Sequence, residues 1–218
     1  MPSYRLPSSI GHIRGTGLPD GASLIAALFV RRDSIYKTLP GVEAFDIERD
    51  ARTYDGPYPV VAHPPCRSWG ALRHFSQPRA DERNLARLAA ALVREFGGVL
   101  EHPANSGLWR AQNLPRPGEA CDGYGGWTLP IQQWQWGHKA AKATWLYIVG
   151  CAPGDIPDMP PFRMGEPEFV VASSKKTRPE ITKAEREHTP PALASWLVEL
   201  ARRCALNQQD RRQGGMLA

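Results

Sequence analysis

Three short stretches of the chain hold residue types that can do chemistry. The first, His63-Pro64-Pro65-Cys66-Arg67-Ser68-Trp69, places a cysteine after two prolines, which fix the direction in which the thiol leaves the backbone. The thiolate is the reactive form of cysteine, and the cation of Arg67 favours it. The motif therefore predicts a nucleophilic Cys66. The alternative is a free cysteine that packs in the core.

The second and third stretches hold an acid and two cations. Glu101 stands in Glu101-His102-Pro103, and a carboxylate in a partly desolvated cleft can protonate or hydrogen-bond a ring nitrogen of a substrate. The stretch from Trp136 to Thr144 brings Lys139 and Lys142, which can hold a phosphate or the carbonyl of a base. The alternatives are a solvated loop acid and lysines that only favour solubility.

Short apolar runs predict the strands that must position these residues. The runs cover residues 23–30, 42–47, 58–63, 99–101 and 144–149. An apolar stripe at helical spacing predicts a helix over residues 85–96, with Asp81 as its cap and Gly97-Gly98 at its end. Residues 103–135 are interpreted as one long loop.

The alternation of strands and helices favours an α/β fold with a doubly wound, mainly parallel sheet. Ligands bind beyond the carboxyl ends of the strands in such sheets. Asp46, Cys66 and Glu101 each follow a predicted strand, so we expect them to share one edge. A last helix after Pro190 completes a single domain over residues 1–206, and residues 207–218 are predicted to form a flexible tail.

Composition excludes several classes of protein. The chain has 218 residues, 42% of them hydrophobic, and no apolar run approaches the roughly 18 residues that a membrane span needs. The four cysteines are scattered, without a CxxC pair, which favours a reduced, cytoplasmic setting over a disulfide framework. Lysine and arginine number 27 against 22 acids, and the net charge of +5 suits a polyanionic partner such as nucleic acid.

Taken together, the three stretches resemble the DNA cytosine-5 methyltransferases. The Pro-Cys motif of that family is matched by Pro65-Cys66, and its Glu-Asn motif by Glu101, with His102 in place of the asparagine. The glycine before its last strands is matched by Gly137, and the strand itself by Leu146-Tyr147-Ile148-Val149-Gly150. The resemblance covers residues 24–203. It extends to small proteins of phages and prophages that share the His-Pro-Pro-Cys and Leu-Glu-His-Pro signatures.

The resemblance implies a Rossmann-like methyltransferase fold, with Cys66 as nucleophile, Glu101 at ring N3 and Lys142 nearest to the position of the family's Gln-x-Arg element. It also implies S-adenosylmethionine as cofactor, although residues 29–34 replace the family's glycine-rich loop. Only about 25 residues separate Gly150 from Lys175, so the target-recognition domain is reduced or absent. The cofactor-binding residues that it implies are Phe29, Asp33, Ser34, Asp46 and Pro64.

DNA is the expected partner, and its bases are expected to stack on tryptophans while cations bind its phosphates. The expected nucleic-acid-binding residues are Arg67, Trp69, Trp109, His138, Lys139, Lys175, Lys176 and Arg178. Three alternatives stay open. The first is a catalytically degenerate protein that binds DNA or a host protein. The second is a thymidylate synthase-like enzyme with a Pro-Pro-Cys nucleophile. The third is a protein with a metal site formed by His63, Cys66, His102 and His138.

Overall fold

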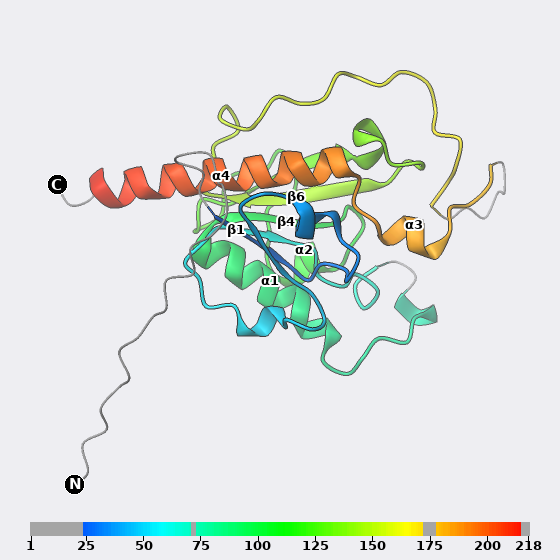
Figure 1. The fold of residues 1–218 in the computed structure, drawn as a ribbon, viewed down its shortest axis with the longest axis horizontal. Helices are drawn as coiled ribbons and strands as arrows, with labels where there is room; N and C mark the ends of the chain where they lie inside the picture. The colour runs from blue at the N-terminus through cyan, green and yellow to red at the C-terminus, as the bar shows by residue number, and fades with distance from the viewer. Residues whose placement is uncertain (1–23, 71–72, 172–177, 215–218) are drawn as a thin grey trace, which may run out of the picture.

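The computed structural model describes residues 24–70, 73–171 and 178–214, and it shows an α/β fold built on one six-stranded sheet (Figure 1). The strand order is β2-β1-β3-β4-β6-β5. The strands are β1 (Ile25–Leu28), β2 (Val42–Phe45), β3 (Val60–Ala62), β4 (Gly98–Pro103), β5 (Trp127–Gln132) and β6 (Ala143–Val149). The α-helices are α1 (Glu82–Phe96), α2 (Leu108–Ala111), α3 (Lys183–Glu187) and α4 (Pro191–Gly214), and four short 3-10 helices are η1 (Ile35–Thr38), η2 (Ala51–Thr53), η3 (Arg73–Phe75) and η4 (Gln133–Trp136).

The sheet is mixed but mostly parallel, which confirms the predicted α/β class. Strands β2, β1, β3 and β4 pair in parallel, whereas β6 runs antiparallel to both of its neighbours. Chain order reverses at β1, which has β2 on one side and β3 on the other. The crevice beyond the carboxyl ends of β1 and β3 is therefore the place where a sheet of this kind binds ligands.

The prediction of one long loop over residues 103–135 is wrong, because this segment contains α2 and β5. Strand β5 lies at the edge of the sheet, and Pro130 stands in its middle. A proline is tolerated on an edge strand, where its missing N–H leaves no partner unsatisfied. The same proline weakens the strand pattern in the sequence, so β5 was not recognised.

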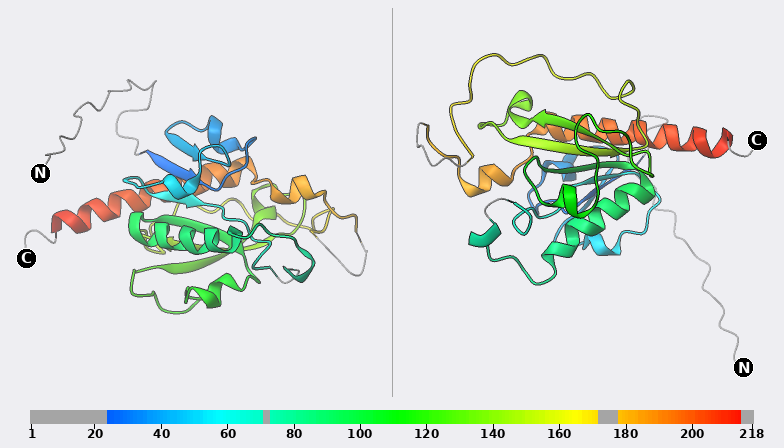
Figure 2. Two further views of the ribbon diagram at one scale, coloured as in Figure 1. Left: turned by 90° about the horizontal axis from the view of Figure 1, so that it is seen from below. Right: turned by 180° about the vertical axis from the view of Figure 1, so that it is seen from behind.

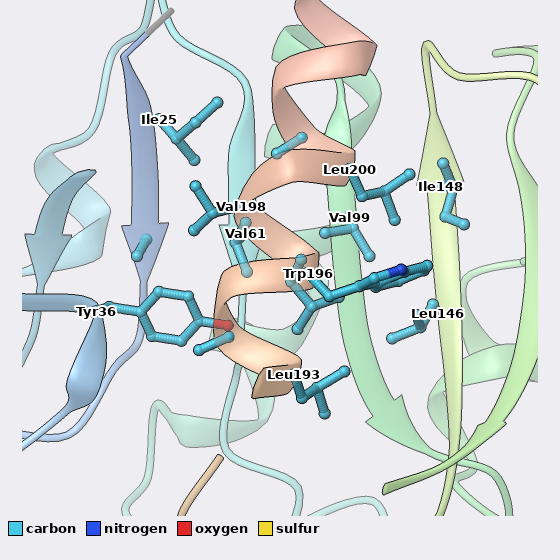
Figure 3. Packing of buried hydrophobic residues seen from close by; sticks show 14 of the residues in the cluster. Ile25, Tyr36, Val61, Val99, Leu146, Ile148, Leu193, Trp196, Val198 and Leu200 are labelled. Carbon is cyan, nitrogen blue, oxygen red and sulfur yellow. The ribbon is translucent and has the colours of Figure 1, made fainter. Parts of the chain in front are cut away.

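Helices cover both faces of the sheet, and each face has its own apolar cluster. Helix α4 packs on one face through Leu193, Val198 and Leu200 (Figure 3). Helix α1, whose packing stripe includes Ala89 and Val93, covers the other face (Figure 2). Among the described helices, none is both long and apolar enough to cross a membrane.

The helix ends follow the predicted signals with two differences. Asp81 precedes α1, but its carboxylate pairs with Arg52 and makes no capping hydrogen bond. Gly97 ends α1 with a φ of 76°, as a left-handed terminus requires. Helix α4 continues past Asn207 to Gly214, beyond the point at which the sequence predicts a tail.

Candidate active site

The centre of the candidate site is the carboxylate of Glu101, near the end of β4. One of its oxygens, Oε2, lies 3.1 Å from Nδ1 of His63, which follows β3. The other, Oε1, accepts a hydrogen bond of 2.9 Å from the side-chain amide of Gln133, the first residue of η4. The same amide nitrogen also donates to the hydroxyl of Thr144. Three elements far apart in the sequence thus fix the position of one acid.

Tyr36 extends this network behind His63. Its hydroxyl lies 2.8 Å from Nε2 of His63, and its ring is almost fully buried. An ionised carboxylate can only accept a hydrogen bond, so Nδ1 of a neutral His63 carries the proton and Nε2 accepts from Tyr36. Burial raises the pKa of Tyr36 well above its ordinary value, so its hydroxyl keeps the proton that it donates.

Glu101 carries its negative charge at neutral pH. Burial by itself would raise the pKa of this carboxyl, but the Lys142 ammonium and the hydrogen bond from His63 lower it to about 2. Lys142 is half-buried and comes just before β6. Glu101 is therefore ionised at neutral pH and can accept a hydrogen bond, and the expectation that it protonates or hydrogen-bonds a substrate stays a prediction.

Cys66 is exposed and lies in the turn that follows β3. The charges of Glu101 and Lys142 both act on its thiol. Desolvation by the surrounding protein raises the pKa of its thiol, the Glu101 carboxylate raises it further, and the Lys142 ammonium opposes them. The guanidinium of Arg67, which the sequence predicts to favour the thiolate, is paired with the buried carboxylate of Glu82. The structure nevertheless brings together the three predicted catalytic residues, Cys66, Glu101 and Lys142.

The tryptophans expected to stack on bases are buried in the core instead. The indole of Trp69 donates to the carbonyl of Arg83, and that of Trp109 donates to the carbonyl of Pro103. Trp109 also packs on Trp145, with ring centroids 5.2 Å apart. Neither ring is free to stack on a base in this conformation, since apolar packing already covers it.

Most of the predicted phosphate-binding cations already have partners. Lys139 pairs with Glu185, and Arg178 pairs with Glu166 at 3.2 Å. His138 is buried, and its Nδ1 lies 2.8 Å from the carbonyl oxygen of Ala140, to which it donates a hydrogen bond. Burial lowers the pKa of its ring, so the ring is neutral at neutral pH. Lys175 and Lys176 lie outside the described residues.

The residues expected to bind S-adenosylmethionine do not fit this cofactor. Both oxygens of the buried Asp46 carboxylate are in use, one by Lys37 at 2.5 Å and the other by the backbone amides of Glu48 and Arg49. A ribose would have to displace the lysine. These contacts also lower the pKa of Asp46 to about 2.

The loop after β1 is filled in the same way. Phe29 has a φ of 59°, a left-handed conformation that favours glycine, and its side chain packs on the apolar cluster under α1. Arg31 bridges Asp33 and Glu187 of α3. The Ser34 hydroxyl caps η1, and Pro64 is buried. No glycine-rich turn lets a cofactor approach the backbone here.

Some buried polar atoms of the described residues have no hydrogen-bond partner. They are the hydroxyl of Ser68, both ring nitrogens of His102, Oε1 of Gln133, Nε2 of His138, and Nε of Arg186 and Arg202. Of these residues, Gln133 belongs to the site, because its amide nitrogen donates to Glu101. Such atoms are rare in folded proteins, and Oε1 of Gln133 is therefore open to a hydrogen bond from a ligand or ordered water.

Sequence reasoning missed the roles of Tyr36 and Gln133, and it considered His63 only as a metal ligand. No local signal marks Tyr36 or Gln133, because both reach Glu101 only through the tertiary fold. His63 lies beside the Pro-Pro-Cys motif and could have been found from the expected convergence of β3 and β4.

Two surface hollows of the described chain lie elsewhere. One, of about 400 Å³, is lined by residues from Trp109 to Asp122, and the other, of about 430 Å³, by residues that include Lys139, Arg163 and Phe169. Neither is lined by Cys66 or Glu101, so the arrangement of charges, rather than a deep cavity, marks the site.

Comparisons with known proteins identify no family. No family model matches the chain, and neither a curated protein nor a solved structure does. The functional assignment therefore depends on the chemistry of the residues around Glu101.

Proposed function

We propose that the protein is a nucleic-acid-modifying enzyme that acts at C5 of a pyrimidine through Cys66. The observation that carries the proposal is the electrostatic coupling of a thiol, an ionised carboxylate and an ammonium group. The Glu101 carboxylate raises and the Lys142 ammonium lowers the pKa of the Cys66 thiol, and the same ammonium lowers the pKa of Glu101. Cys66 follows β3, Glu101 lies within β4 and Lys142 precedes β6. This chain order supports the proposal, because it is the order that the resemblance to cytosine-5 methyltransferases implies. No step is assigned to S-adenosylmethionine, since the residues do not fit it.

The chemistry begins with addition of the Cys66 thiolate to C6 of the ring. The Sγ–C6 bond forms, the C5=C6 double bond breaks, and its electron pair moves onto C5 and the ring carbonyl. The Lys142 ammonium stabilises the negative charge that develops, and the Glu101 carboxylate accepts a hydrogen bond from N3–H of a uracil ring or from the exocyclic amino group of a cytosine ring. A one-carbon donor then gives its electrophilic carbon to C5, and the bond to its leaving group breaks with the electron pair going to that group. A water molecule takes the C5 proton, and expulsion of the thiolate restores the double bond.

The finer fold assignment is part of the same proposal. We infer a Rossmann-like methyltransferase fold without a target-recognition domain. The reversal of strand order at β1 supports it, as does the segment between β6 and α3, in which the described residues form only isolated bridges. Base readout is expected to be slight, because few residues remain to enter a groove.

Exchange of the C5 hydrogen tests the proposal without knowledge of the electrophile. Once the thiolate is bonded to C6, C5 takes up a proton from solvent, so oligonucleotides incubated in D₂O should gain deuterium at C5 of one pyrimidine. Mass spectrometry of the released nucleosides measures the gain. We expect Cys66→Ser to abolish it and Cys121→Ser, which removes another exposed thiol, to leave it unchanged. Exchange that survives in Cys66→Ser, or its absence in the wild type with every pyrimidine, overturns the proposal.

A second function is favoured by one observation: both oxygens of the Asp46 carboxylate already have hydrogen-bond partners within the protein. A protein that no longer binds a cofactor could keep such a fold to bind nucleic acid or a host protein. The two functions are distinguished by the same experiment, because a degenerate protein binds its partner without exchange at C5.

A further inference from the structure

The loop after Cys66 leads to a group of exposed arginines at the start of α1. The Cys66 carbonyl accepts hydrogen bonds of 2.9 Å from the amides of Trp69 and Gly70, which close a tight turn. The Trp69 indole then donates to the carbonyl of Arg83 in α1. Cys66 is thus joined to the first turns of α1 by hydrogen bonds.

Four arginines of this region have exposed side chains. Arg83 and Arg87 lie one helical turn apart, with their guanidinium carbons 4.7 and 5.6 Å from the centre of the Trp69 ring. Arg79 lies just before α1, and Arg73 is the first residue of η3. The hydroxyl of Ser76, which follows η3, donates hydrogen bonds to the carbonyls of Arg67 and Arg73. We name Arg73, Arg79, Arg83 and Arg87 the arginine surface. It lies on the side of the sheet that α1 covers (Figure 2).

The nearby acids do not neutralise the arginine surface. The Glu82 carboxylate is committed to Arg67, and the Asp81 carboxylate to Arg52. Within the described part of the chain, none of the four arginines has a carboxylate at ion-pair distance. By contrast, Arg31, Arg49 and Arg203 each have one. The surface therefore carries uncompensated positive charge, and the turn after Cys66 is joined to it by the hydrogen bond from Trp69 to Arg83.

Charge complementarity indicates a polyanion with forked acceptors. A guanidinium group donates two parallel hydrogen bonds to a phosphate, and a pair of them one turn apart can contact phosphates along a strand. We propose that the arginine surface binds the phosphate backbone of a DNA strand whose pyrimidine is presented to Cys66. This inference rests on the proposed function, which supplies the reason for a pyrimidine at Cys66.

The test compares two double variants by fluorescence anisotropy with a labelled DNA oligonucleotide at several salt concentrations. In Arg83→Gln/Arg87→Gln we expect affinity at moderate salt to fall by at least about tenfold. We also expect the slope of log K against log salt to become shallower by roughly 1.4 to 1.8, as the loss of two phosphate contacts predicts. Arg49→Gln/Arg203→Gln is the matched control. It removes the same charge, and Arg49 also lies over an aromatic ring, at 3.9 Å from the centroid of Phe45.

Three outcomes overturn the inference. They are an equal loss of affinity in the control, an unchanged slope in the arginine-surface variant, and equal arginine-dependent binding of poly-glutamate or of anionic lipid vesicles. Thermal unfolding of both variants checks that the fold is kept.

Failure of this inference is distinguishable from failure of the proposed function. If exchange at C5 occurs but the variant binds as the wild type does, the chemistry stands and the surface is wrong. If binding depends on Arg83 and Arg87 but no exchange occurs, the surface stands and the chemistry is wrong. If both stand, exchange in the variant should reach the wild-type rate at saturating oligonucleotide and fall only at limiting oligonucleotide.

Discussion

Two opposite charges act on the thiol of Cys66. The Glu101 carboxylate disfavours the thiolate and the Lys142 ammonium favours it, while desolvation adds to the effect of Glu101. The reactive form is therefore scarce in the free protein at neutral pH. A substrate that shields or engages Glu101 would remove part of this penalty, so binding and activation of the thiol are coupled.

The reactivity of Cys66 should report these charges directly. We expect its rate of alkylation by iodoacetamide to rise with pH to a midpoint above the ordinary value for cysteine. Glu101→Gln should move that midpoint down, and Lys142→Gln should move it up. Peptide mass spectrometry follows Cys66 and the exposed Cys121 in the same sample, and the midpoint of Cys121 should not move. A shift of Cys66 in the same direction in both variants would contradict the arrangement.

Acid should weaken the fold through two buried carboxylates. The pKa values of Asp46 and Glu101 are each about 2 in the folded protein, below the ordinary values of 3.8 and 4.5. Because the folded pKa values are depressed, these groups stabilise the protein above about pH 4.5, and this contribution is lost as pH falls toward 2.

Urea unfolding at a series of pH values checks the acid effect. Between pH 4.5 and 2, the free energy of unfolding of Asp46→Asn should fall by about 2 kcal/mol less than that of the wild type, since the substitution removes one of the two titrating groups. If the free energy of unfolding falls equally in the variant and the wild type, the pKa of Asp46 is not lowered in the folded protein.

At the scale of elements, the entry into β4 places Glu101. Gly98 opens this strand with a φ of 112°, and a Cβ at this position would lie 2.0 Å from the carbonyl oxygen of Val60 in β3. Only glycine lets the two strands pair as closely as they do here. This pairing in turn sets His63, just after β3, beside Glu101.

Gly98→Ala should therefore separate β3 from β4. We expect a loss of more than about 2 kcal/mol of unfolding free energy, measured in urea. Gly154→Ala is the matched control, because a Cβ there meets no atom within 4 Å, and it should change stability by less than about 0.5 kcal/mol. Similar free energies of unfolding for the two variants would contradict the close approach of Gly98 in β4 to Val60 in β3.

At the scale of the whole molecule, one sheet joins two apolar clusters. The cluster under α4 and the cluster under α1 take alternate residues of the same strands, such as Val99 and Leu100 of β4. Loss of either helix exposes one face of strands whose alternate residues pack against the other helix. The two faces should therefore unfold together.

Leu197→Ala in α4 tests this cooperativity. The side chain is fully buried, and its truncation should cost about 2–5 kcal/mol. Hydrogen exchange followed by mass spectrometry should show equal losses of protection in α4 and in α1. Phe162→Ala removes a side chain that is 82% exposed and should leave both unchanged. Loss of protection in α4 alone would show that the faces are independent.

The sequence by itself determined those features that depend on local pattern. Apolar runs and an apolar stripe were enough to predict β1, β2, β3, β4, β6, α1 and α4, since burial imposes a period on each element. The parallel class of the sheet then followed, and with it the expectation that Cys66 and Glu101 share an edge.

Only the tertiary structure decided the partners of each polar side chain. Lys37 pairs with Asp46, and Glu82 pairs with Arg67. Tyr36 hydrogen-bonds His63, and Gln133 hydrogen-bonds Glu101, from segments that no local pattern connects. A tryptophan also has the same sequence signal whether it stacks on a base or, as Trp69 and Trp109 do, fills the core. Periodicity is a property of one element, whereas the charge state and exposure of a side chain depend on what other elements place around it.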